Sequence, residues 1–262
     1  MLMRFFLVLA VFLNSLTCSA VNVSANASNL NKALVNSSRV YPQVGSATPT
    51  SPLKLVYQIG EFAQGGVVIW VTNDRQHGLV ASIVNLGPTT GSHPYTLAWG
   101  PMNVQTNATR DNPLPTFYTN TTPKENYSGY QNQKKILELD PNLSDYPAFA
   151  ACANYSIKIG DTTYNDWFLP SLQELNQIYN LRDTVSKVSE ANGGKALFTK
   201  PTDPGLSSYW SSREDEDYSS SAWLLFFFYG SQSNDSKGHS FRCALCPGFL
   251  THYQFNNLTR AA

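Results

Sequence analysis

The sequence predicts an α+β domain of twisted antiparallel strands with two main helices and long loops. Three observations predict this class. Two β-branched runs flank a polar turn within 65–84, and segments 144–155 and 169–183 combine helical spacing with helix-start signals. Strand-like runs then occupy 209–212 and much of 222–246. Strands therefore open and close the domain, with helices between them.

The N-terminus has the features of a secretory signal peptide over residues 1–20. Arg4 precedes an apolar run over 5–13, and small residues lead up to Ala20. The run is shorter than the ~20 apolar residues that a membrane-spanning helix needs. A lipid anchor at Cys18 is the alternative, and it is disfavoured by the preceding threonine. The sequence thus predicts a protein that is secreted or displayed at the cell surface.

Residues 21–56 are rich in Asn, Ser, Val and Pro and show no sustained periodicity, which is typical of a flexible tether. The folded domain is expected over 57–262. The formal net charge of the whole chain is zero, and no run of Lys and Arg is visible. This composition argues against a nucleic-acid partner, because such binding depends on many cationic contacts to phosphates.

The first hairpin is expected within 65–84, with its turn near 73–77 and both strands inside a sheet, since both are apolar on more than one face. From about 88 to 142 hydrophobic periodicity is nearly absent, which predicts a long elaborated loop region. The aromatic residues in that region either present flat faces to a sugar or pin the loop to the core.

Two helices follow. In the first, Asp145 is the expected cap, Pro147 fits the first turn, and Cys152 falls on the inward face. In the second, Ser171 and Glu174 form an S-x-x-E capping box before an apolar stripe.

The segment Tyr209–Gly230 combines an aromatic YWSS, Arg213, four consecutive acids over 214–217 and an apolar run. The apolar run predicts a strand covered on both faces, and the polar stretch after it predicts a turn. Because the acids lie between two predicted strands, the simplest expectation is a solvated loop. A calcium site there is the alternative, but calcium needs six to eight oxygens and consecutive acids diverge.

Of the four cysteines, Cys152, Cys243 and Cys246 remain after signal cleavage, so one pair and one leftover thiol are expected. Spacing alone does not identify the pair. The C-x-x-C at 243–246 has no second such motif or histidine pair to complete a zinc site, which favours a structural disulfide over redox or metal chemistry.

No hydrolase, metalloprotease, phosphate-loop or dinucleotide motif is present. The remaining enzyme hypothesis is a glycosidase-type carboxylate pair drawn from Asp166, Glu174 and Asp215. The prediction is therefore a protein that is not an enzyme and needs no cofactor.

Four motifs in one order carry a resemblance: YQIGEFAQGGVVIWV with HGLVAS after it, then DWFLPSLQELNQIY, then YWSS, then AW with a downstream FRC. Together they resemble the Lcl C-terminal domain family, secreted bacterial domains named for a collagen-like adhesin. The resemblance runs in pieces from Tyr57 to Phe249. It implies a C-type-lectin-like mixed domain and adhesion to extracellular glycans, with a homotrimer as in the namesake. This chain has no Gly-X-Y repeat and no net positive charge, so sulfated glycans are not specifically expected.

On this basis the sequence predicts a glycan or surface-polysaccharide binding module. The runner-up hypotheses are a glycan-active enzyme and a structural envelope protein without a small ligand. The candidate ligand-binding residues are Arg213, Trp210, Asp215 and Trp99. The family also places cysteines near Cys152 and Cys243, which implies a disulfide between them and leaves Cys246 unpaired.

Overall fold

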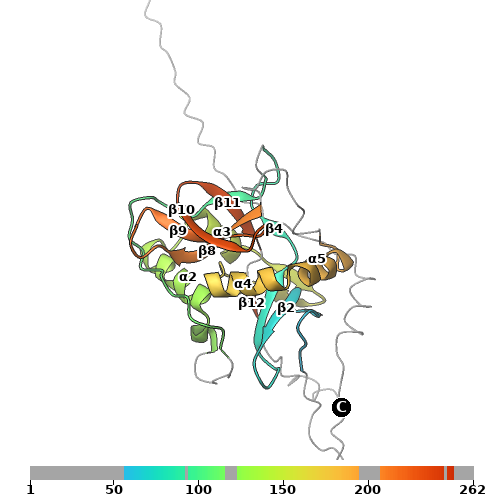
Figure 1. The fold of residues 1–262 in the computed structure, drawn as a ribbon. Helices are drawn as coiled ribbons and strands as arrows, with labels where there is room; N and C mark the ends of the chain where they lie inside the picture. Colours follow the sequence, from blue (N-terminus) through green and yellow to red (C-terminus); the bar gives the residue numbers. More distant parts are fainter. Residues whose placement is uncertain (1–55, 92–93, 116–122, 195–206, 245–246, 251–262) are drawn as a thin grey trace, which may run out of the picture.

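A computed structural model describes residues 56–91, 94–115, 123–194, 207–244 and 247–250, with the backbone alone at 243–244 and 249–250. The predicted signal peptide and nearly all of the predicted tether lie outside these ranges. The described part is a mixture of helices and mainly antiparallel sheets, so the predicted α+β class is confirmed. Figure 1 shows a sheet above and a sheet below helix α4.

The lower sheet has the strand order β1-β2-β3-β12. Its strands are β1 (Phe62–Ala63), β2 (Gly66–Val71), β3 (Gly78–Ser82) and β12 (Pro247–Leu250). The predicted hairpin is confirmed as β2 and β3, which are the two inner strands. Their β-branched and apolar side chains are buried on both faces, as expected of inner strands. The last described strand therefore returns to the first hairpin.

The upper sheet has the order β10-β9-β8-β11-β4, and β5 also pairs with β11. Its strands are β4 (Asn85–Leu86), β5 (Thr96–Ala98), β8 (Ser208–Glu214), β9 (Ser221–Phe226), β10 (Ser231–Ser236) and β11 (Ser240–Ala244). The pairing of β8 with β11 is parallel, whereas the other pairs are antiparallel. A small separate ribbon pairs β6 (Ile157–Ile159) with β7 (Thr162–Tyr164).

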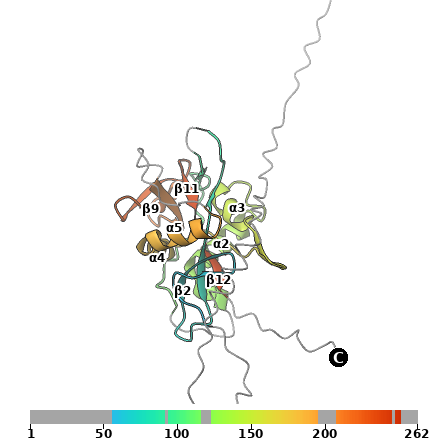
Figure 2. The ribbon, with the colours of Figure 1, turned by 90° about the vertical axis from the view of Figure 1, so that its right-hand side faces the viewer.

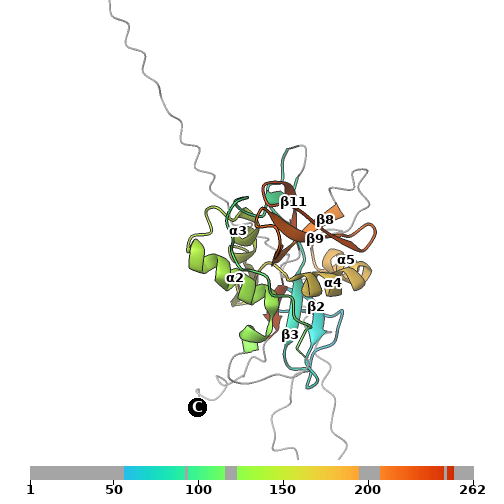
Figure 3. The ribbon, with the colours of Figure 1, turned by 60° about the vertical axis from the view of Figure 1, so that its left-hand side comes forward.

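The helices are α2 (Ser128–Leu139), α3 (Pro147–Ala153), α4 (Leu172–Asn180) and α5 (Arg182–Ala191), preceded by the short helix η1 (Pro123–Asn126). Helix α4 contacts β8 and β9 of the upper sheet and β2 of the lower one, and Figures 2 and 3 show it between the two sheets. In the part of the chain that is described, no helix has the length and apolar character that a bilayer crossing requires.

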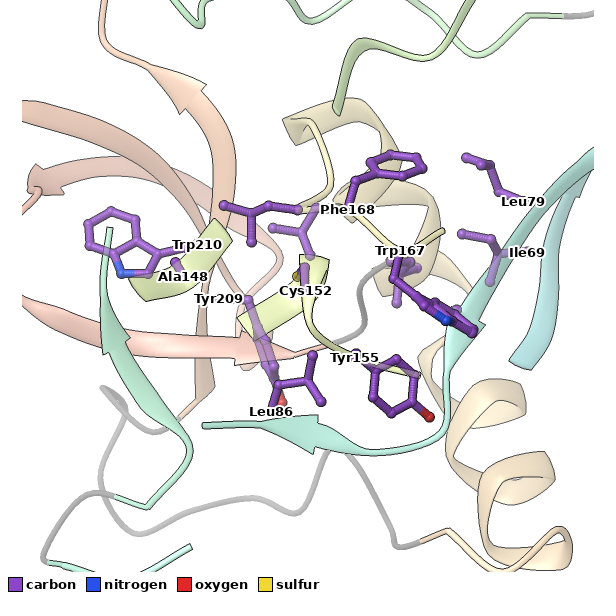
Figure 4. Packing of buried hydrophobic residues seen from close by; sticks show 14 of the residues in the cluster. Ile69, Leu79, Leu86, Ala148, Cys152, Tyr155, Trp167, Phe168, Tyr209 and Trp210 are labelled. Atoms are coloured by element: carbon purple, nitrogen blue, oxygen red, sulfur yellow. The ribbon is translucent and has the colours of Figure 1, made fainter. Parts of the chain in front are cut away.

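One buried cluster connects the two sheets. Figure 4 shows Ile69 and Leu79 of the lower sheet and Tyr209 and Trp210 of the upper sheet, with Phe168 between them. The large aromatic rings meet mostly edge to face, the arrangement that their quadrupoles favour. The core therefore depends on both sheets.

Helix α4 begins as the sequence predicts. The Ser171 hydroxyl accepts a hydrogen bond from the Glu174 N–H at 3.3 Å, and the Glu174 carboxylate accepts one from the Ser171 N–H at 2.8 Å. Leu172, Leu175 and Ile178 form the buried stripe. The capping box is confirmed in both directions.

Helix α2 corrects part of the prediction of a long elaborated loop region over 88–142. Its buried face consists largely of Ser128, Gly129, Asn132 and Gln133, with Ile136 as the one large apolar residue. Such a face has no apolar period to detect. Gly129 lies so close to α4 that an added Cβ would stand 2.3 Å from the Glu174 carboxylate.

Three smaller expectations are also corrected. Asp145 does not cap α3, which begins at Pro147 after an uncapped Tyr146. The polar segment expected as a turn after β9 is the edge strand β10, held by backbone pairing with β9. The apolar run of β9 is not covered to its end, because Phe228 and Tyr229 lie exposed in the turn that follows.

The cap makes a stability prediction. Replacing Ser171 by alanine removes the acceptor for the Glu174 N–H, so we expect Ser171→Ala to lower the free energy of unfolding by about 0.5 to 2 kcal/mol. Urea denaturation would measure it. Gln173→Ala, at an exposed position in the same turn, should change the free energy by less than about 0.5 kcal/mol. Equal values for the two variants would count against the cap.

Candidate functional site

The two tryptophans expected at a ligand surface lie in the core. Trp99 and Trp210 are almost completely buried. The Trp99 indole N–H donates to the Ser211 carbonyl at 2.8 Å, and the Trp210 indole N–H donates to the Leu97 carbonyl at 2.9 Å. Neither ring has a face open to a sugar, so the structure corrects their predicted role to one in packing.

The acid-rich stretch begins inside a strand. Glu214 is the last residue of β8, and its carboxylate forms an ion pair with the Lys237 ammonium in which both side chains are fully buried. The ammonium also donates to the Val104 carbonyl at 2.8 Å and lies 4.8 Å from the centre of the Trp99 ring. Both charges are thus removed from water and matched.

Glu214 also binds the backbone of a loop far away in the sequence. Its carboxylate accepts hydrogen bonds from the N–H groups of Thr106 at 2.9 Å and Asn107 at 2.8 Å, and from the Gln105 side chain at 3.0 Å. This arrangement corrects the expectation of a solvated loop for Glu214, whereas Glu216 and Asp217 are exposed as expected. Exposure was expected because the acids lie between two predicted strands, and local pattern gives no sign of a partner loop more than a hundred residues away.

Asp215 is likewise buried and structural. Its carboxylate accepts hydrogen bonds from the N–H groups of Asp217 at 3.0 Å and Tyr218 at 3.3 Å and contacts the Asn234 amide. It therefore closes the turn between β8 and β9 instead of facing a ligand. Within the described ranges, no three His, Cys, Asp or Glu side chains are grouped closely enough to hold a metal ion.

Arg213 is the predicted site residue that reaches the surface. It lies in β8, with 22% of its side chain exposed. Its guanidinium forms ion pairs with Asp111 at 3.5 Å and with the exposed Glu216 at 3.1 Å, and it lies 5.4 Å from the centre of the Trp223 ring. An arginine that lies over an aromatic ring and is flanked by carboxylates is therefore presented near the end of β8.

Trp223 was not among the predicted site residues. It is half-buried on β9 and lies opposite the exposed Asn234 of β10. The Nε1 of Trp223 and the Nε of Arg213 are both shielded from water and have no hydrogen-bond acceptor. We call Arg213, Trp223 and Asn234, with Glu216 at their edge, the Arg213 surface. Sequence reasoning missed Trp223 because it lies within an apolar run typical of a buried strand, and nothing in that local pattern indicates that its ring is only half-buried.

The carboxylates considered for catalysis form hydrogen bonds or ion pairs within the fold. Glu174 is fully buried and accepts the N–H groups of Ser171 and Gly129, so it joins the starts of α4 and α2. Burial raises the pKa of Glu174 to about 7. Burial also raises the pKa of the nearby Asp111, which accepts the Gln173 N–H at 2.8 Å. Asp166 pairs with Lys124 at 3.4 Å.

Cys152, buried in α3, is disulfide-bonded. The side chains of Cys243 and Cys246 lie outside the described residues, so Cys243 as its partner stays a prediction. No family model matches the chain, and no curated protein matches it. The resemblance to the Lcl C-terminal domain family therefore also stays a prediction.

The buried ion pair makes a prediction. Lys237→Met keeps an unbranched side chain one atom shorter but leaves Glu214 without its cation, so we expect a loss of about 3 to 5 kcal/mol in the free energy of unfolding. Denaturant titration would measure it. The double variant Glu214→Gln/Lys237→Met should recover part of the loss, because no charge then remains buried. A single variant as stable as the parent protein would refute this account.

The pKa of Glu174 makes a prediction on pH. Its value in the fold, about 7, lies above the ordinary 4.5, so the folded state holds the proton more tightly than the unfolded chain. The stability from this group is fully present below pH 4.5 and is lost as pH rises through 7. The slope should approach about 1.4 kcal/mol per pH unit at most.

Urea denaturation between pH 4.5 and 8 would test this dependence. Glu174→Gln mimics the neutral carboxyl, so its stability should lie close to that of the parent protein at the acidic end and should fall less as pH rises. Parallel pH profiles for the two proteins would show that another group is responsible.

Proposed function

We propose that the protein is a secreted or surface-exposed binding module that recognises a carbohydrate through the Arg213 surface, without catalysis. The observation that carries the proposal is a partly exposed guanidinium that lies over a half-buried indole. Aromatic faces pack against the C–H groups of sugars, and guanidinium groups donate to hydroxyl and carboxylate oxygens. The resemblance to the Lcl C-terminal domain family supplies the ligand class.

The surface around Arg213 and Trp223 has the polar character that a sugar requires. β10 is an edge strand whose side chains are all polar, and several are exposed. Tyr218, in the turn between β8 and β9, is 64% exposed. Hydroxyl and amide groups beside an exposed aromatic ring can bind sugars at modest affinity.

The proposal includes a C-type-lectin-like arrangement of the α+β fold. It is supported by the pairing of β12 with β3, which returns the last described strand to the first hairpin. The chain between these strands forms the upper sheet and the loops that carry the Arg213 surface.

A glycan array with the full secreted chain would test the proposal. We expect binding to one class of glycan and at least about a tenfold loss of affinity in Arg213→Ala, since a charge-assisted hydrogen bond contributes about 1.5 to 3 kcal/mol. The ion pairs of Arg213 are partly exposed, so they should contribute about 1 kcal/mol or less, which corresponds to about 4 °C or less in the thermal midpoint.

A matched control is Arg182→Gln, because Arg182 also lies over an aromatic ring, 4.5 Å from the centre of Tyr179, and is outside the Arg213 surface. It should bind like the parent protein. If Arg213→Ala unfolded the domain but kept its affinity, Arg213 would be structural and the proposal would fail. Turnover of a bound glycan would favour the enzyme hypothesis, and a lack of binding across the array would favour the structural envelope protein.

A further inference from the structure

Arg242 in β11 is a buried cation without a matching anion. Its exposed fraction is 8%. Within the part of the chain that the structure describes, its side chain makes one hydrogen bond, from Nη1 to the Tyr209 hydroxyl at 3.5 Å, and its Nε is buried with no acceptor. Among the described residues, no Asp or Glu forms an ion pair with it, in contrast to Lys237 and Arg213.

Three adjacent strands bring polar groups to this point. Arg242 of β11 is in register with Tyr209 of β8, and β4, on the other side of β11, carries Asn85. The Tyr209 hydroxyl lies 3.5 Å from the Asn85 side-chain oxygen. These contacts are at the outer limit of hydrogen bonding, so each of them is weak.

A guanidinium held in this way is costly to the fold unless something compensates for its charge. Its donors are arranged in a plane that matches the two oxygens of a carboxylate or the edge of a sulfate. The Tyr209 hydroxyl can add one hydrogen bond, and the side-chain amide of Asn85 can add a donor. Asn85 is half-buried and 8% of Arg242 remains exposed, so a small anion would approach the cluster from the side of Asn85.

From this geometry we propose that Arg242, Tyr209 and Asn85 form a binding site for a small oxyanion group, a carboxylate or a sulfate. The site is separate from the Arg213 surface and does not depend on the proposed function. An anion bound there would neutralise Arg242 and connect β8, β11 and β4.

Isothermal titration of the full chain tests the proposal, with sodium sulfate and sodium D-glucuronate as probes at an ionic strength held constant with sodium chloride. D-glucose is the uncharged control. We expect saturable binding of at least one anion and none of glucose. Binding of sulfate alone or of glucuronate alone would identify which oxyanion the site takes.

Arg242→Gln should weaken anion binding at least about tenfold, since it removes the charge and the planar donor pair. Tyr209→Phe keeps the ring that packs 4.5 Å from Phe227 and removes only the hydroxyl, so a smaller loss of roughly threefold is expected. Arg110→Gln is the control, because Arg110 is an exposed arginine elsewhere in the chain, and it should bind like the parent protein.

The proposal is overturned if neither anion binds, or if Arg242→Gln and the parent protein bind equally. It is also overturned if Arg110→Gln loses as much affinity as Arg242→Gln, since the effect would then reflect general charge. If Arg242→Gln fails to fold, anion binding is measured instead on Tyr209→Phe and on Arg242→Lys. Weaker binding in both supports the site, and unchanged binding in both refutes it.

Discussion

The pairing of Glu214 with Lys237 is the interaction on which the arrangement of the upper sheet depends. The carboxylate terminates β8, the ammonium follows β10, and the loop at 104–107 binds to both. Because both charges are buried, the loop must stay in place to satisfy them. The ammonium also contacts the Trp99 ring, which packs against Phe149 of α3, so one ion pair connects the edge of the sheet to the helical core.

A second buried carboxylate, that of Glu174, likewise joins separate elements. Glu174 completes the capping box of α4 and also accepts an N–H of α2, so the two helices start at one side chain. The loop that begins at 104–107 continues along α2. There the Asn132 side chain exchanges hydrogen bonds with the backbone of Arg110, and the Ser128 hydroxyl accepts one from the Asn112 N–H. Side-chain oxygens and amides therefore satisfy backbone hydrogen-bonding groups of this loop, as strand pairing does in the sheets.

The three long cationic side chains of the upper sheet are in different states. Lys237 is buried and paired, Arg213 is partly exposed and paired, and Arg242 is buried with no anion partner among the described residues. The burial of Lys237 is explained by its ion pair within the fold. The other two are the places where the described structure leaves hydrogen-bonding capacity for a ligand, at the Arg213 surface and at the Arg242 cluster.

The sequence by itself determined the elements that local pattern encodes. The hairpin β2–β3 follows from its β-branched runs, and α4 follows from a capping box and an apolar stripe, because these signals act over a few residues. Tertiary structure decided the rest. Helix α2 buries a polar face, and β10 is polar on both sides. Glu214 is buried by a loop more than a hundred residues away and by Lys237, which follows two further strands. The surface of Trp223 and the isolation of Arg242 arise in the same way, since only long-range packing decides which charges and rings find partners.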